Sequence, residues 1–131
     1  MKTDLVTKPV ILIVDDDPDL LILLQHRLQS EGFEVYVSPN GVSMMDIITH
    51  TPPKLILLDI HMDGLDGGTI CQLIKTNPGT ASLPVILFSA NDNIQSIAIK
   101  CGADGYIQKP FEAGKFREAL KRIPQLGLET S

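Results

Sequence analysis

The 131-residue sequence lacks an apolar run long enough to cross a membrane. No stretch reaches the roughly 18 apolar residues that a transmembrane helix needs. The first apolar run is short, begins after Lys8 and Pro9, and has no small-residue cleavage site behind it, so a signal peptide is not expected. The composition, 44% hydrophobic and 21% charged, is ordinary for a soluble globular protein. We therefore expect a soluble, cytoplasmic protein with no membrane partner.

The sequence also lacks a dense patch of lysines and arginines. Its net charge is −5 and its pI is near 5.0, so direct binding to the phosphate backbone of nucleic acids is not expected. It has only two cysteines, Cys71 and Cys101, and neither lies in a Cys-x-x-Cys motif or at a metal-ligand spacing from a histidine. We expect both to be reduced, largely buried thiols.

The length suits a single domain, which we expect to run from residue 8 to residue 124 between short polar termini at 1–7 and 125–131. A chain of this size buries about two-thirds of its unfolded surface without disulfides or metals. Strands are expected at 10–14, 33–37, 55–58, 83–88 and 105–108. Helices are expected from Pro18 to just before Gly32 and at 42–49, 69–76, 91–101 and 111–123, with a permissive glycine-rich loop at 59–68.

This order, a strand followed by a helix five times, predicts the fold class. Strands that alternate with helices form parallel sheets with helices on both faces. We therefore expect a single doubly wound (βα)5 domain of the α/β class with a five-stranded parallel sheet. In such sheets ligands bind at the carboxyl ends of the strands, near the point where the strand order reverses.

Aspartates directly follow two of the expected strands. The first strand ends in Asp15, Asp16 and Asp17, and the third ends in Asp59. Because the ends of buried parallel strands emerge at one edge of a sheet, these carboxylates are expected to collect in one crevice. Two carboxylates about 4 Å apart repel by about 4 kcal/mol at an effective dielectric constant of about 20. A Mg²⁺ ion, usually held by one or two carboxylates, would relieve this repulsion, with Asp16 and Asp59 as ligands.

Two more polar residues are expected at the same edge. Ser89 ends the fourth strand and Lys109 the fifth, and a hydroxyl and an ammonium group stabilise phosphoryl oxygens. Together with the aspartates they indicate phosphoryl chemistry. Taken singly, the first aspartates and Ser89 could merely cap helices, and Lys109 could be a solvated turn residue. Neither simple role suits Asp59, which directly follows four aliphatic residues. Burying an unpaired carboxylate there is costly.

Four segments carry a resemblance to a known family. They are 11–18 (ILIVDDDP), 55–62 (LILLDIHM), 84–90 (PVILFSA) and 102–111 (GADGYIQKPF). With them the chain resembles, over nearly its whole length, the receiver domain of two-component response regulators, a CheY-like family that includes single-domain chemotaxis proteins. The resemblance implies a flavodoxin-like fold with strand order 2-1-3-4-5. It also implies a phosphorelay signalling module rather than an enzyme that turns over an outside substrate.

The resemblance implies a role for each residue of the acidic edge. Asp59 would be the phosphoacceptor, which takes a phosphoryl group from the phosphohistidine of a histidine kinase or a histidine phosphotransfer protein. Asp15, Asp16, Asp59 and the backbone carbonyl of His61 would hold Mg²⁺, for which Mn²⁺ could substitute. Lys109 would pair with Asp59 at rest and with the phosphoryl group afterwards.

The resemblance also implies a switch. Ser89 would move to bond a phosphoryl oxygen, and Tyr106 would turn inward when it does. The surface of the fourth helix, fifth strand and fifth helix would then change its affinity for a downstream protein, a fused output domain or a second copy of the chain. From the residues alone, Tyr106 reads more simply as a strand aromatic packed on Ile97 or Lys100.

The sequence departs from the family pattern near the acceptor. The family often has proline after the methionine at 62, where this chain has Asp63 and Gly64. His61 and Asn91 occupy the two variable positions that influence how fast the acyl phosphate hydrolyses. The peptide bond before Pro110 is cis in the family, an isomer that proline tolerates.

Two other functions remain open from the residues. A Mg²⁺-dependent phosphatase also passes through an aspartyl phosphate, but such enzymes usually need a second aspartate where this chain has His61. A structural receiver would act through its protein surface alone, but that role gives no reason to keep the aspartates and Lys109 together.

Overall fold

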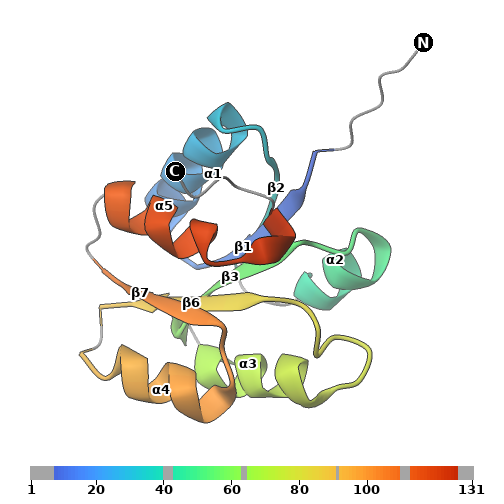
Figure 1. The fold of residues 1–131 in the computed structure, drawn as a ribbon, viewed down its shortest axis with the longest axis vertical. Helices are drawn as coiled ribbons and strands as arrows, with labels where there is room; N and C mark the ends of the chain where they lie inside the picture. Colours follow the sequence, from blue (N-terminus) through green and yellow to red (C-terminus); the bar gives the residue numbers. More distant parts are fainter. Residues whose placement is uncertain (1–7, 40–42, 63–64, 91, 110–112, 127–131) are drawn as a thin grey trace.

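Five parallel strands form the centre of the molecule (Figure 1). The computed structural model describes residues 8–39, 43–62, 65–90, 92–109 and 113–126. The strands of the sheet are β1 (Val10–Val14), β2 (Glu34–Ser38), β3 (Leu55–Asp59), β6 (Val85–Ser89) and β7 (Gly105–Gln108). Their order in space is β2-β1-β3-β6-β7, so the order reverses beside β1. The expected doubly wound α/β fold with strand order 2-1-3-4-5 is confirmed.

Five helices cover the two faces of this sheet. They are α1 (Pro18–Ser30), α2 (Met44–His50), α3 (Gly67–Thr76), α4 (Ile94–Cys101) and α5 (Ala113–Lys121). Helices α1 and α5 pack on one face, and α2, α3 and α4 pack on the other (Figure 1). Alternate strand residues serve the two cores: Ile11 and Ile13 face α1 and α5, whereas Leu12 and Val14 face the other three helices. Burial on both faces explains the continuous apolar runs.

The boundaries of α1 follow from local chemistry. The Asp17 carboxylate accepts hydrogen bonds from the backbone N–H groups of Asp19 and Leu20, and Pro18 occupies the first helical position. Gly32, at a φ of +98°, ends the helix in a conformation that residues with a Cβ rarely adopt. The helix therefore begins and ends where the sequence indicates.

The glycine-rich segment after β3 is more ordered than expected. Within it, β4 (His61–Met62) pairs antiparallel with β5 (Leu65–Asp66), so the expectation of a plain loop at 59–68 is corrected. Helix α3 begins at Gly67, two residues before the expected start, because the Asp66 carboxylate caps it by accepting a hydrogen bond from Gly68 N–H. Two-residue strands are too short to leave an alternating pattern in the sequence.

Other boundaries differ by a few residues from those expected. The second, third and fourth strands each end one residue later than expected. The expected starts of the second, fourth and fifth helices, at 42, 91 and 111, lie outside the described residues. After α5, the short 3₁₀ helix η1 (Pro124–Leu126) places Leu126 in the core beside α1 and α5. The expected domain limits, residues 8 and 124, stay a prediction.

A single carboxylate fixes the amino ends of the last two strands. Asp104 Oδ2 accepts a hydrogen bond from Val85 N–H at 2.8 Å and from Lys75 Nζ at 3.0 Å. Lys75 Nζ also donates to the Leu83 carbonyl at 2.9 Å. The end of α3 is thereby joined to the starts of β6 and β7, at the edge of the sheet opposite the aspartates. Within the described residues, no helix combines the length and apolarity needed to span a bilayer.

Candidate metal centre

Asp15 lies at the end of β1 and is completely buried. The parallel register, which pairs Val14 with Leu58, sets Asp15 beside the end of β3. Its Oδ1 accepts a hydrogen bond from Asp17 N–H at 2.9 Å, and its Oδ2 accepts one from Lys109 Nζ at 3.0 Å. This buried carboxylate is thus held by two donors, one of them charged, which offsets the cost of burying it.

Asp59 ends β3, and only 4% of its surface is exposed. Its Oδ1 lies 3.7 Å from Lys109 Nζ and accepts a weak hydrogen bond from His61 N–H at 3.4 Å. Lys109 is therefore closer to Asp15 than to Asp59, the partner that the resemblance implied. Its Nζ also lies 4.9 Å from the centroid of the Phe88 ring, which is a cation–π contact.

Three carboxylates converge at this point. One oxygen from each of Asp15, Asp16 and Asp59 lies within 4.8 Å of the others, and Asp16 is the exposed member of the group. The ammonium group of Lys109 pairs with two of these carboxylates, those of Asp15 and Asp59. Hard oxygen ligands at this spacing, with one open side, fit a Mg²⁺ ion that keeps several of its waters.

The burial and the neighbouring charges of the pocket shift the pKa of Asp59. This pKa is raised from 3.8 to about 6, first by burial and then by the negative charges of Asp15 and Asp16. The Lys109 ammonium group and the His61 N–H act in the opposite direction. The ionised form of Asp59 is thus less stable than that of an exposed aspartate. A bound cation would stabilise it.

Gly67, which the sequence did not single out, lies against the backbone of the acceptor. A Cβ at this position would be 2.1 Å from the Asp59 carbonyl oxygen and 2.7 Å from Ile60 Cα. Gly67 N–H donates to the Ile60 carbonyl at 2.8 Å, which draws the start of α3 onto the end of β3. The only sequence signal was the pair of glycines at the start of α3, because a close tertiary approach leaves no periodic pattern.

The remaining predicted site residues lie on β6, β4 and β7. Ser89 ends β6 and is 98% buried, and its carbonyl accepts a hydrogen bond from Lys109 N–H at 2.8 Å. His61 lies in β4 next to the acceptor, with an exposed side chain. Tyr106 is on β7 and 41% exposed, so it is not turned inward. Asp63, Gly64, Asn91 and Pro110, on which other expectations depended, lie outside the described residues.

The two cysteines are both free and buried, as expected. Cys71 on α3 donates from Sγ to the Cys101 carbonyl at 3.6 Å. Burial raises the pKa of the Cys71 thiol far above its ordinary value, so the reactive thiolate is not formed at neutral pH. These thiols belong to the core rather than to the site.

Comparison with solved structures agrees with this fold. The chemotaxis protein CheY4 of Vibrio cholerae superposes with a TM-score of 0.80 over 89% of this chain and 99% of that one, at 20% identity. The BeF3-activated N-terminal receiver domain of RstA from Klebsiella pneumoniae has a TM-score of 0.78 over 87% of this chain and 97% of that one, at 28% identity. The sheet with its acidic pocket therefore defines a CheY-like α/β domain.

The sequence comparisons identify the family. The profile of the response regulator receiver domain matches residues 11–121, and the chain therefore belongs to this family. A relative in Synechocystis, the DNA-binding dual master transcriptional regulator RpaA, is 34% identical over 120 residues, which are 90% of this chain. The chain spans about half the length of this curated relative, 48% of it. The chain is thus a receiver domain of two-component signalling, a signalling module and not a classical enzyme.

Proposed function

We propose that Asp59 is the phosphoacceptor of this receiver domain. The observation that carries the proposal is the position of its carboxylate, buried within 4.8 Å of ligand atoms of Asp15 and Asp16 and 3.7 Å from the Lys109 ammonium group. An Asp59 oxygen would attack the phosphorus of a phosphohistidine. The P–O bond forms as the P–N bond breaks, and the leaving imidazole takes up a proton. The donor is a histidine kinase or a histidine phosphotransfer protein, in the cytoplasm.

The neighbouring groups have distinct tasks in this proposal. Asp15, Asp16, Asp59 and the His61 backbone carbonyl would hold Mg²⁺ or Mn²⁺, which when bound neutralises charge on the phosphoryl oxygens. Lys109 pairs with Asp15 at 3.0 Å and lies 3.7 Å from Asp59, and it would move onto the phosphoryl group. The approach of a doubly charged group would then draw the Ser89 hydroxyl towards it.

The output of the switch would be the surface of α4, β7 and α5. Tyr106 lies on this surface in the exposed orientation, and Lys109 directly follows β7. A movement of Ser89 and Lys109 would therefore reach Tyr106 through β7, which carries the tyrosine and directly precedes Lys109. The partner at this surface would be a downstream protein, a fused output domain or a second copy of the chain.

Intact-mass spectrometry tests the acceptor. Incubation of the protein with Mg²⁺ and acetyl phosphate is expected to add the mass of one phosphoryl group, and Asp59→Asn is expected to abolish the addition. Asp46→Asn, which removes an exposed carboxylate of the same charge on α2, serves as the control and should still take up one group. An unchanged mass of the intact protein, or equal uptake by Asp59→Asn, would refute the proposal.

Mg²⁺ is expected to stabilise the protein through the same pocket. An ion that binds only the folded state adds about 2.7 kcal/mol at a concentration of about 100 times its Kd. Thermal unfolding in increasing Mg²⁺ should show this rise for the unmodified protein and most of it lost in Asp16→Asn, whereas Asp46→Asn should retain it. The same stabilisation in all three proteins would place the ion elsewhere.

A further inference from the structure

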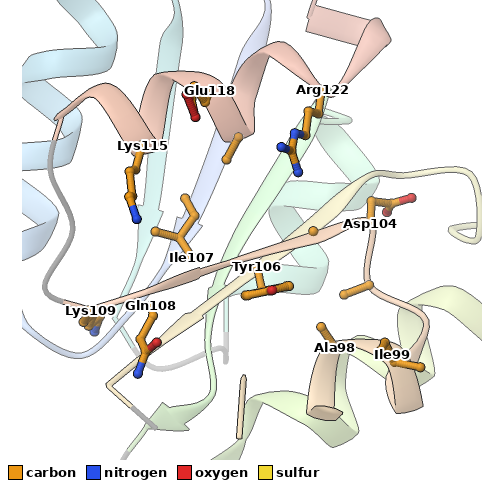
Figure 2. Close-up of a pocket in the computed structure, with 13 residues that line it drawn as sticks. Ala98, Ile99, Asp104, Tyr106, Ile107, Gln108, Lys109, Lys115, Glu118 and Arg122 are labelled. Atoms are coloured by element: carbon orange, nitrogen blue, oxygen red, sulfur yellow. The ribbon is translucent and has the colours of Figure 1, made fainter. Parts of the chain in front are cut away.

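A pocket of about 630 Å³ lies between α3 and α4, on the face of the sheet that these helices share (Figure 1). Its volume is in the range of small-molecule binding sites. None of its lining residues belongs to the larger groove beside Tyr106, which lies on the proposed output surface (Figure 2). The pocket is therefore a separate feature of the molecule.

The first two turns of α3 and the end of α4 form the walls of this pocket. Residues three or four apart share one face of a helix, which places Gly68 and Gln72 together on α3. The same spacing places Ile97 and Lys100 together on α4. Ile60, which follows β3 and is 2% exposed, adds a buried apolar residue. The other lining residues are His61, Asp66, Thr69 and Cys101.

The two walls approach each other most closely at Gly68 and Ile97. A Cβ on Gly68 would be 3.4 Å from Ile97 Cγ2. Both helices connect parallel strands, so they run in the same direction. At a rise of about 1.5 Å per residue, Lys100 lies about 4.5 Å further along α4 and Gln72 about 6 Å further along α3. The pocket therefore has an apolar end at Ile97 and an exposed polar end at Lys100 and Gln72.

The two helices that form the walls contain no acidic residue. Neither α3 nor α4 has an aspartate or a glutamate, although the net charge of the chain is −5. Each helix has one lysine in its last turn, and Lys75 of α3 is paired with Asp104 at 3.0 Å. Within the described part of the chain, Lys100 of α4 has no ion-pair partner. Its ammonium group is therefore available to an anion.

Asp66, which precedes α3, limits how much negative charge the pocket can accept. Its Oδ1 accepts a hydrogen bond from Gly68 N–H at 3.0 Å, and its Oδ2 accepts one from the Thr69 hydroxyl at 3.0 Å. These bonds hold the carboxylate beside the apolar end, where it would repel a second anionic group of a ligand. A ligand with one negative charge, placed at Lys100, avoids this repulsion.

We infer that this pocket is a binding site for a small organic anion with one negative charge and an apolar body, of which an aromatic carboxylate is the simplest example. The carboxylate would pair with Lys100 and accept a hydrogen bond from the Gln72 amide, while the apolar body would lie beside Ile97 and Ile60. Apolar lining with a few placed polar groups is typical of ligand sites. The inference stands apart from the proposed function, because it uses neither Asp59 nor the metal.

Two probes with the same apolar body and opposite charges test this site. They are 2-naphthoate and 2-naphthylmethylammonium, each titrated into the full chain at neutral pH and followed by ¹H–¹⁵N NMR. The naphthoate is expected to bind about tenfold tighter than the ammonium probe. The largest shifts of backbone signals are expected at Gln72, Ile97 and Lys100. Inorganic phosphate at the same concentration should not displace the naphthoate, because it has no apolar body.

Two variants test the role of the charge. Lys100→Glu should reverse the preference for the naphthoate, and Gln72→Glu, which has nearly the same shape, should remove it by placing an acid beside Lys100. The matched controls are Lys54→Glu, at an exposed site before β3, and Gln29→Glu, at an exposed site on α1. Both controls should keep the preference, because they make the same changes in net charge away from the pocket.

Several results would overturn the inference. Equal affinity for the two probes, or no binding of either at millimolar concentration, would show that the pocket is not an anion site. Full displacement by phosphate would reduce it to a lysine that pairs with any anion. Shifts confined to Tyr106 and Lys115 would place the probe in the groove of Figure 2. A preference that survives in Lys100→Glu would exclude this lysine as the partner of the anion.

Discussion

Replacing Asp59 with asparagine is expected to stabilise the metal-free protein by about 3 kcal/mol at pH 8. The pKa of this carboxyl group is raised from 3.8 to about 6 in the folded state, by burial first and then by Asp15. Since each pKa unit corresponds to about 1.4 kcal/mol, holding the ionised carboxylate in the pocket costs the folded state about 3 kcal/mol. Asparagine has nearly the same shape and no charge, so the variant avoids this cost.

The sign of the pH dependence follows from the same shift. Between pH 3.8 and about 6 the folded protein holds a proton on Asp59 that the unfolded chain releases, so stability falls as the pH rises through this window. Above about pH 6, the folded state bears the full free-energy cost of the ionised carboxylate. The difference between Asp59→Asn and the unmodified protein should therefore be largest above pH 7, small near pH 4 and absent well below pH 3.8.

Urea unfolding in EDTA at several pH values measures this difference. At pH 8 an effect of this size corresponds to an increase of about 10 °C in Tm. Asp46→Asn, the exposed control, is expected to change the free energy of unfolding by less than about 1 kcal/mol. A variant that is equally or less stable than the unmodified protein at pH 8 would show that the pocket does not destabilise the Asp59 anion. Added Mg²⁺ should reduce the advantage of the variant, because the ion stabilises only the charged form.

The second large effect is expected from Gly67→Ala. The added methyl group would lie 2.1 Å from the Asp59 carbonyl oxygen, so either α3 or the end of β3 must move. Overpacking of this kind typically costs about 1–3 kcal/mol. A misplacement of about 1 Å at reacting groups can lower a rate by about 100-fold, so phosphoryl uptake should slow by a factor of this order.

Gly68→Ala is the matched control for this variant. Its added methyl group would meet Asp66 Oδ1 and Ile97 Cγ2 at 3.4 Å, side-chain atoms that can give way. Replacing a helical glycine by alanine raises the free energy of unfolding by up to about 1 kcal/mol, which offsets the cost of these contacts. Gly68→Ala should therefore change little in urea unfolding and in the rate of phosphoryl uptake. Equal behaviour of the two variants would show that Gly67 does not position the acceptor.

The sequence predicted the parts of the molecule that depend on local patterns. The apolar runs and the residues that end them gave the strands, and parallel pairing then brought Asp15, Asp59 and Lys109 to one edge. It missed β4 and β5, because two-residue strands have no periodicity, and it missed Gly67, because contact with the backbone of Asp59 is a tertiary property. It also could not rank the two partners of Lys109, since a difference of less than 1 Å depends on side-chain packing.

The hydrogen bonds of Asp104 determine where β7 can respond to a change at the pocket. Asp104 directly precedes β7, and its carboxylate accepts hydrogen bonds from Val85 at the start of β6 and from Lys75 on α3. The amino ends of β6 and β7 are therefore tied to α3. At the other end, Lys109 is shared between two aspartates and follows the last residue of β7. A new anion that attracts Lys109 would therefore act at the end of β7 opposite this tie, where Lys109 N–H donates to the Ser89 carbonyl at 2.8 Å, so the carboxyl ends of β6 and β7 would move together.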